Sequence, residues 1–246
     1  MKYLKYIILI FSIFFICSCN SLFIDLLTSK EVKTEVFYNQ EKNKTLVLFP
    51  MVHINHPEFY DDTKSKLEKL RQQGYTVFFE SIALKDSTVF NTQEMDTLTR
   101  KTRKISGIYM SDYKDQKNKS LPKAIRNSNY ISQNRENLGF QEQDMIVDIP
   151  MNELIEIYEA KYGVIQLTQC DWETDYLEKY ECETVPQVRA NDVLIYTRND
   201  TIEKRIYESK LKKIALVYGK KHFQFIRGGF MQNGYKEVDT LNLFNE

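Results

Sequence analysis

The sequence predicts an α/β fold whose mixed, mostly parallel sheet is flanked by helices. Three nearly continuous apolar runs are typical of strands that are buried on both faces. These runs are residues 45–52, 75–80 and 213–218. A helical segment that starts at Pro57 and ends before Gly74 joins the first two runs, so they form a βαβ unit with parallel strands.

The chain also contains an internal similarity. A strand, a histidine, a helix, a Gly-Tyr pair and a strand follow one another over 45–80 and again over 213–241. In the second stretch we expect a helix from about Lys221 to Gln232 and a final strand from Tyr235 to Leu241. This similarity predicts two pseudo-repeated βαβ-like halves.

The first 18 residues are expected to be a lipoprotein signal peptide. A short basic region precedes an apolar run from Tyr6 to Ile16, which is too short for a convincing membrane span. Ile16-Cys17-Ser18-Cys19 resembles a bacterial lipobox. The resemblance implies cleavage before Cys19 and attachment of lipid, including palmitate, to that residue. The chain would then be anchored in the cell envelope, at the inner or the outer membrane. The alternative is an uncleaved signal anchor.

Residues 19–32 would be a tether, and residues 33–246 one α/β domain. The chain has 246 residues, of which 42% are hydrophobic, and this is enough for one sizeable core. Its 34 basic and 34 acidic residues balance. Because a nucleic-acid partner requires a basic surplus or stripe, we expect none.

The elements between the apolar runs are less regular. Residues 33–38 alternate weakly, as an edge strand would. Residues 86–104 predict a helix whose basic end, 100–104, is expected to be solvated. Loops and short helices are expected over 105–140, where they could cover the site as a lid. Two further helices are expected, one from Glu153 to about Lys161 with Asn152 as its cap, and one from Asp171 to about Tyr180.

A helix that opens at Pro186 contains a buried arginine. Apolar residues and Arg198 recur on it at spacings of three and four, which is one helix face. The residues on this face are Val188, Asn191, Ile195, Arg198, Ile202 and Ile206. A buried guanidinium needs a partner or a ligand. Arg198 is therefore predicted to bind an anion or an oxyanion, with Asn199 as an additional donor and Tyr218 lining the site.

Two cysteines follow the signal peptide region, Cys170 and Cys182. An exported compartment would permit a disulfide between them, and two free thiols are the alternative. Neither lies in a metal-site spacing. No histidine is near in sequence, so cysteine catalysis is not expected.

Three residues at strand ends form a candidate metal site. His53 follows the first apolar run, Glu80 ends the second, and His222 follows the third. Two imidazoles and one carboxylate suit a catalytic divalent metal such as Mn²⁺, Co²⁺ or Zn²⁺. Each residue also has a structural reading, and for Glu80 this is a core ion pair with Arg198. His56 is either an additional ligand or a helix-entry residue.

Four motifs in order resemble the TraB/GumN/PrgY family, which includes the TIKI metalloproteases. They are Pro50-Met51-Val52-His53, Val77-Phe78-Phe79-Glu80, Arg198-Asn199 and Gly219-Lys220-Lys221-His222, with Gly234-Tyr235 downstream. Pro50 stands where the family has glycine, and Lys220-Lys221 replace small residues. The resemblance implies a metal-dependent, peptidase-like hydrolase with His53, Glu80 and His222 at the metal. It implies that Arg198 binds the substrate or the transition state.

The leading hypothesis is therefore an envelope-anchored metallohydrolase that cleaves a peptide or another acyl bond, with Glu80 as ligand or general base and Arg198 as oxyanion stabiliser. The alternative is a non-enzymatic binding lipoprotein that holds haem or another small ligand in the same cleft. A degenerate family member with an adhesion or signalling role is a third reading. The sequence leaves open whether the chain forms a homodimer.

Overall fold

A six-stranded mixed sheet forms the centre of the protein. The computed structural model describes residues 28–84, 89–109, 117, 119, 129–239 and 243–244. The sheet has the strand order β6-β4-β7-β2-β1-β8. Its strands are β1 (Glu35–Asn39), β2 (Lys44–Met51), β4 (Thr76–Phe79), β6 (Met145–Ile146), β7 (Lys213–Gly219) and β8 (Tyr235–Val238). The predicted α/β class is confirmed.

Parallel pairing brings four strand ends to one edge of this sheet. β2 pairs with β7, β7 with β4, and β4 with β6, all in parallel. β1 is antiparallel to both β2 and β8. The carboxyl ends of β2, β7, β4 and β6 therefore lie together. The strand predicted at 33–38 is not an edge strand, because β8 covers its outer side.

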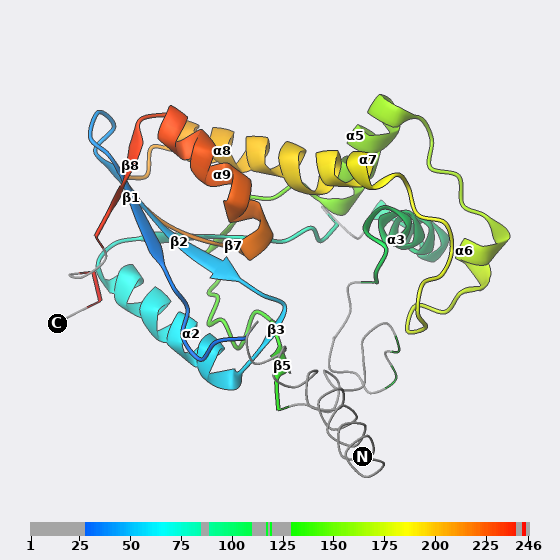
Figure 1. The fold of residues 1–246 in the computed structure, drawn as a ribbon, viewed down its shortest axis with the longest axis horizontal. Helices are drawn as coiled ribbons and strands as arrows, with labels where there is room; N and C mark the ends of the chain where they lie inside the picture. The colour runs from blue at the N-terminus through cyan, green and yellow to red at the C-terminus, as the bar shows by residue number, and fades with distance from the viewer. Residues whose placement is uncertain are drawn as a thin grey trace, which may run out of the picture.

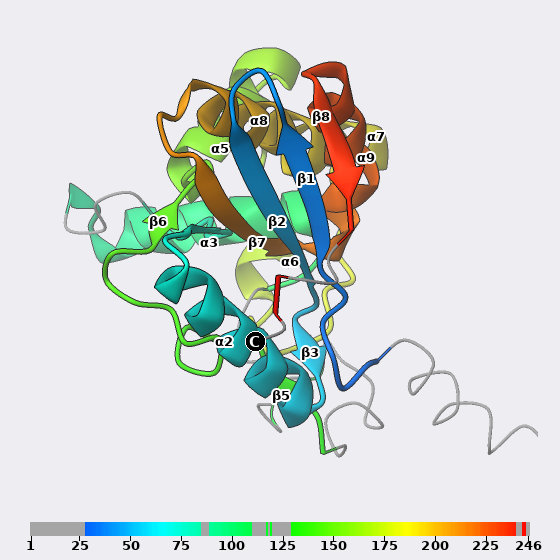
Figure 2. The same ribbon diagram turned by 90° about the vertical axis from the view of Figure 1, so that its left-hand side faces the viewer.

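Helices cover both faces of the sheet (Figures 1 and 2). Helix α2 (Pro57–Gln72) packs on one face, where its Phe59, Leu67 and Leu70 join a buried cluster with strand residues. Gly74 follows this helix at φ +82°, as a terminating glycine does. Helices α8 (Arg198–Glu208) and α9 (Lys220–Gln232) cover the other face. The predicted βαβ unit is confirmed, with β7 inserted between its two strands.

A second group of helices extends from one end of the sheet (Figure 1). These are α3 (Thr92–Ser106), α5 (Met151–Tyr162), α6 (Gln169–Glu173) and α7 (Gln187–Asn191), which is followed by the π-helix η2 (Asp192–Thr197). α3, α5, α7 and η2 share their own apolar cluster, and α6 joins them through polar contacts with α3. A small two-stranded sheet of β3 (Ile54–Asn55) and β5 (Ile131–Ser132) follows β2.

The basic end of α3 is not solvated, and that prediction is wrong. Arg103 is 2% exposed and Lys104 is 8% exposed. The Lys104 ammonium lies 2.7 Å from a carboxylate oxygen of Asp171, and the Arg103 guanidinium stacks over the Tyr180 ring. The Cys170–Cys182 disulfide closes this region. Aromatic rings and a carboxylate thus take the place of water around these charges.

Helix ends also differ from expectation. Asp171 lies inside α6, and its carboxylate accepts hydrogen bonds from Thr168, the residue that caps this helix of only five residues. α5 begins at Met151 with Pro150 as its N-cap, so Asn152 lies inside the helix and does not cap it. The expected signal peptide, the lipidation at Cys19 and most of the tether lie outside the described residues, as does much of the expected lid. Among the described helices, none combines the length and the apolarity that crossing a bilayer requires.

Candidate functional site

Polar side chains meet where the parallel strands end. Glu80 follows β4, Asp148 follows β6 by two residues, and Gly219 ends β7. Arg198 and His222 enter from α8 and α9, which lie on the same face of the sheet. In open α/β sheets, this carboxyl edge is where ligands bind.

A π-helix turns Arg198 toward this edge. The predicted single helix from Pro186 is interrupted by η2, and Arg198 is the first residue of α8. A π-turn adds a residue and so rotates the next part of the helix; such turns are frequent at functional sites. Ile202 and Ile206 keep the predicted buried face, whereas Val188, before the π-turn, is 75% exposed. The predicted stripe therefore holds from Ile195, which lies within the π-helix, onward.

Arg198 is the centre of the site. Its Nε and Nη2 donate to the two carboxylate oxygens of Asp148, at 2.9 and 2.6 Å. Nη2 also donates to Glu80 Oε1 at 2.7 Å and to the Tyr218 hydroxyl at 2.9 Å. Nη1 donates to the Leu194 carbonyl at 3.1 Å. A buried guanidinium between two carboxylates is electrostatically compensated, and its position is fixed by the bidentate pair.

His222 is a neutral imidazole with both nitrogens engaged. Burial, aided by the charge of Arg198, lowers the pKa of His222 to about 4. Asn199 Nδ2 donates to the His222 carbonyl, which leaves Asn199 Oδ1 to accept from His222 Nδ1 at 2.7 Å. His222 Nε2 then carries the lone pair and accepts from Arg198 Nη1 at 3.2 Å. Asn199 thus orients the ring rather than facing a substrate.

Glu80 is a carboxylate held at the surface of this cluster. Its Oε2 accepts the Gly219 N–H at 2.6 Å. A Cβ at position 219 would lie 3.0 Å from that oxygen, so glycine permits this close approach. Burial alone would raise the pKa of Glu80, but the charge and the hydrogen bond of Arg198, together with His222 and His53, outweigh burial and lower the pKa. Glu80 is therefore ionised, and its side chain keeps 18% exposure, against 0% for Asp148.

His53 lies at the rim of the site. It follows β2, its side chain is exposed, and its charge contributes to lowering the pKa of Glu80. His56 has a structural position instead. It precedes α2, its ring stands edge-on to Tyr130 at 4.7 Å, and its Nε2 lies 3.3 Å from the Thr28 hydroxyl. The helix-entry reading of His56 fits this geometry.

A divalent metal does not fit these residues as they are arranged. Within the described part of the chain, no three His, Cys, Asp or Glu side chains are grouped to hold a metal ion. Glu80 and His222 approach to 4.0 Å, but the Arg198 guanidinium bridges them and uses the Nε2 lone pair that a metal would need. Arg198 already supplies the positive charge that Mn²⁺, Co²⁺ or Zn²⁺ would bring.

Asp148 is a site residue that the sequence patterns did not identify. It follows Met145-Ile146-Val147, a run of three apolar residues. The same layout, an apolar run followed by a carboxylate, had identified Glu80. Only two residues of this run form the strand β6, and so short a run does not stand out in a sequence.

The protein-family models, the curated proteins and the solved structures compared with this chain give no match. A function for this chain is therefore inferred from the geometry of its site.

Proposed function

We propose that this chain is a hydrolase that cleaves acyl bonds at the carboxyl edge of the sheet, with water as the nucleophile. The observation that carries the proposal is an ionised, partly exposed Glu80 that is held by Arg198 and by the Gly219 N–H, with the exposed His53 close enough to lower its pKa. A carboxylate beside an imidazole is an arrangement that supports general base catalysis. No metal takes part in the proposed step.

His53 would take the proton of the attacking water and return it to the leaving group, which is the role of a histidine in general acid–base catalysis. Glu80 would orient the imidazole and stabilise the imidazolium that forms. Arg198 is a positioning residue, because acceptors within the protein surround its guanidinium. This differs from the direct oxyanion contact that the sequence predicted for it. Tyr218 and Asn199 support Arg198 and His222.

The experiment is hydrolysis of p-nitrophenyl acyl esters by the purified protein, with and without a chelator. We expect Glu80→Gln and His53→Gln each to lower kcat/KM by about 10²-fold or more, since general acid–base catalysis contributes about 10²–10⁴-fold. The control His56→Gln replaces the neighbouring histidine and should keep the activity. A chelator should have no effect.

Two outcomes would contradict the proposal. Activity that a chelator abolishes and Mn²⁺, Co²⁺ or Zn²⁺ restores would favour the metallohydrolase reading. No hydrolysis of any acyl ester would favour the non-enzymatic binding lipoprotein, and a Soret band after mixing with haemin would then identify haem as its ligand.

The setting of this activity is part of the same proposal. A lipid on Cys19 would anchor the chain in the cell envelope, and the resemblance to the TraB/GumN/PrgY family would account for the motifs around His53, Glu80, Arg198 and His222. The two βαβ-like halves are kept as a proposal, supported by the histidines that follow β2 and β7. Labelling with a radioactive fatty acid, with Cys19→Ser as the control, tests the anchor.

A further inference from the structure

A groove opens beside the site where β1 and β2 diverge. β1 pairs with β2 only from Glu35, which lies opposite Leu48. The chain before Glu35 turns toward α2, where the Val32 N–H donates to Asp62 at 2.8 Å. The space left along the end of β2 has a volume of about 410 Å³. Small-ligand sites have volumes in this range.

Pro50 shows that the sequence is adapted to this opening. A proline cannot donate a hydrogen bond to a neighbouring strand and is therefore confined to edge positions. Pro50 pairs with Tyr218 of β7, but it lies beyond the last β1 pair at Leu48. On the β1 side, Pro50 therefore has no paired strand to which an N–H would have to donate.

The lining of the groove combines apolar and cationic groups. Pro50, Val52 and Phe59 form its apolar part, and Lys33 and Lys220 contribute ammonium groups. In the described part of the chain, neither lysine has an ion pair. Glu35 and Arg227 also line the groove, but they pair with each other. Glu31 is the single carboxylate left to oppose the two lysines, so the lining has a net charge of +1.

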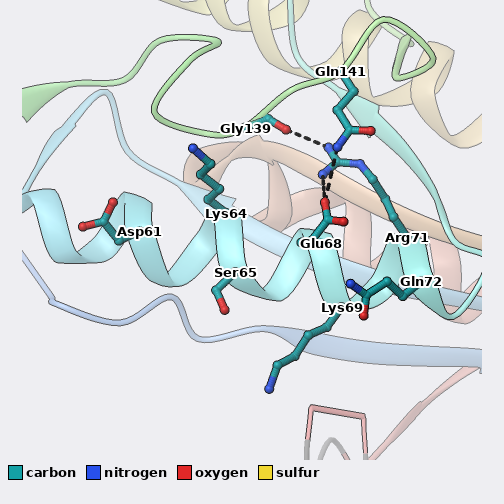
Figure 3. A pocket seen from close by; sticks show the side chains of 9 residues that line it. All are labelled: Asp61, Lys64, Ser65, Glu68, Lys69, Arg71, Gln72, Gly139 and Gln141. Atoms are coloured by element: carbon teal, nitrogen blue, oxygen red, sulfur yellow. Dashed lines mark hydrogen bonds and ion pairs between the residues drawn. The ribbon is translucent and has the colours of Figure 1, made fainter.

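A second groove of the protein provides a contrast. It lies along α2 beside Gly139 and Gln141, and its arginine bonds to a neighbouring carbonyl and carboxylate (Figure 3). Arg71 donates to the Gly139 carbonyl at 3.0 Å and forms ion pairs with Glu68 and Asp144. The other residues that line this groove are polar or charged, so it lacks the apolar part that Pro50, Val52 and Phe59 provide beside β2.

The groove beside β2 is also next to the proposed catalytic groups. Lys220, which lines it, follows Gly219, whose N–H donates to Glu80. Val52, which also lines it, precedes His53. A molecule in the groove would therefore have one end beside Glu80 and His53.

We infer that this groove binds the acyl part of the substrate, and that this part carries a carboxylate on a short apolar chain. The apolar chain would contact Pro50, Val52 and Phe59, and the carboxylate would lie between Lys33 and Lys220. This inference depends on the proposed function for the bond that is cleaved. The binding preference itself can be measured without turnover.

The first test compares two esters whose acyl chains have the same length, p-nitrophenyl valerate and mono-p-nitrophenyl glutarate. We expect kcat/KM to be about fivefold or more higher for the glutarate ester, which is the size of effect of one exposed ion pair. The double variant with Lys33→Gln and Lys220→Gln should lose this preference. Lys64→Gln, a lysine in the groove along α2, should keep it. A preference that survives the double variant would overturn the inference.

The second test needs no hydrolysis. Hexanoate and hexanamide are titrated into the protein and followed by NMR, in the wild type and in the double variant. In the wild type, hexanoate should bind at least fivefold more tightly than hexanamide. In the double variant this difference should be absent. If this difference is found but no ester is hydrolysed, the proposed hydrolase function is wrong and the inference that the groove binds a carboxylate still stands. Equal binding of the two probes, or binding of neither, would overturn the inference whether or not esters are cleaved.

Discussion

Asp148→Asn is the substitution that tests the site most directly. The Asp148 side chain is fully buried, and its two oxygens accept from Arg198 at 2.9 and 2.6 Å and from the Ile149 N–H at 2.8 Å. Asparagine removes the negative charge and places an NH₂ group against a guanidinium N–H. Breaking a buried ion pair by removing one partner costs about 3–5 kcal/mol. Because Arg198 keeps Glu80 as a second carboxylate, we expect about 3 kcal/mol.

Urea unfolding of the purified protein measures this free energy, and thermal unfolding should show a fall in Tm of about 6–12 °C for a domain of this size. Asp144→Asn is the matched control. Its carboxylate is also buried and pairs with Arg71 at 2.6 Å, but on the opposite face of the sheet, beside α2. Both variants should lose stability, and only Asp148→Asn should lower ester hydrolysis. An Asp148→Asn protein within about 1 kcal/mol of the wild type would refute the role given to this pair.

Three further predictions concern His222, Gly219 and the disulfide. The pKa of His222 is about 4 in the folded chain and 6.5 ordinarily, so the unfolded chain binds more protons between these two pH values. The free energy of unfolding should therefore fall by about 3 kcal/mol as the pH drops from 6.5 to 4. Urea titrations in which the His222→Gln variant shows the same fall would contradict this prediction. Gly219→Ala should push Glu80 from its place and lower kcat/KM for ester hydrolysis while the circular dichroism spectrum is kept; unchanged kinetics would contradict the close contact. Reducing Cys170–Cys182, which are 12 residues apart, should lower the free energy of unfolding by about 2–3 kcal/mol; calorimetry showing no difference would mean that the bond does not constrain the unfolded chain.

Several features of the site could be predicted from residue patterns. β2, β4 and β7 are apolar runs, and each is followed by a residue that was predicted to act. Because parallel strands end at one edge, the approach of Glu80 to His222 followed from the positions of these residues at strand ends. The burial of Arg198 followed from its place on the apolar face of a helix. The class of fold was predictable for the same reason.

The arrangement of partners was not predictable. A periodic pattern records which positions are buried, but not which polar group meets which. Asp148 follows a strand of only two residues, and the π-helix that turns Arg198 inward leaves no apolar signature. Arg103 and Lys104 at the end of α3 were expected to be solvated. Their partners, the Tyr180 ring and the Asp171 carboxylate, lie about 70 positions further along the chain, where a local pattern does not reveal them.

Neighbouring residues were enough to specify the strands, the βαβ unit and the candidate residues, because burial patterns and turn chemistry are local properties of the chain. The use of a guanidinium, rather than a metal, to join Glu80 to His222 was settled by packing between distant elements. The Nε2 lone pair of His222 can be used once, and the packing of α8 against α9 directs it to Arg198. That choice depends on distances between elements far apart in the chain, which no local pattern contains.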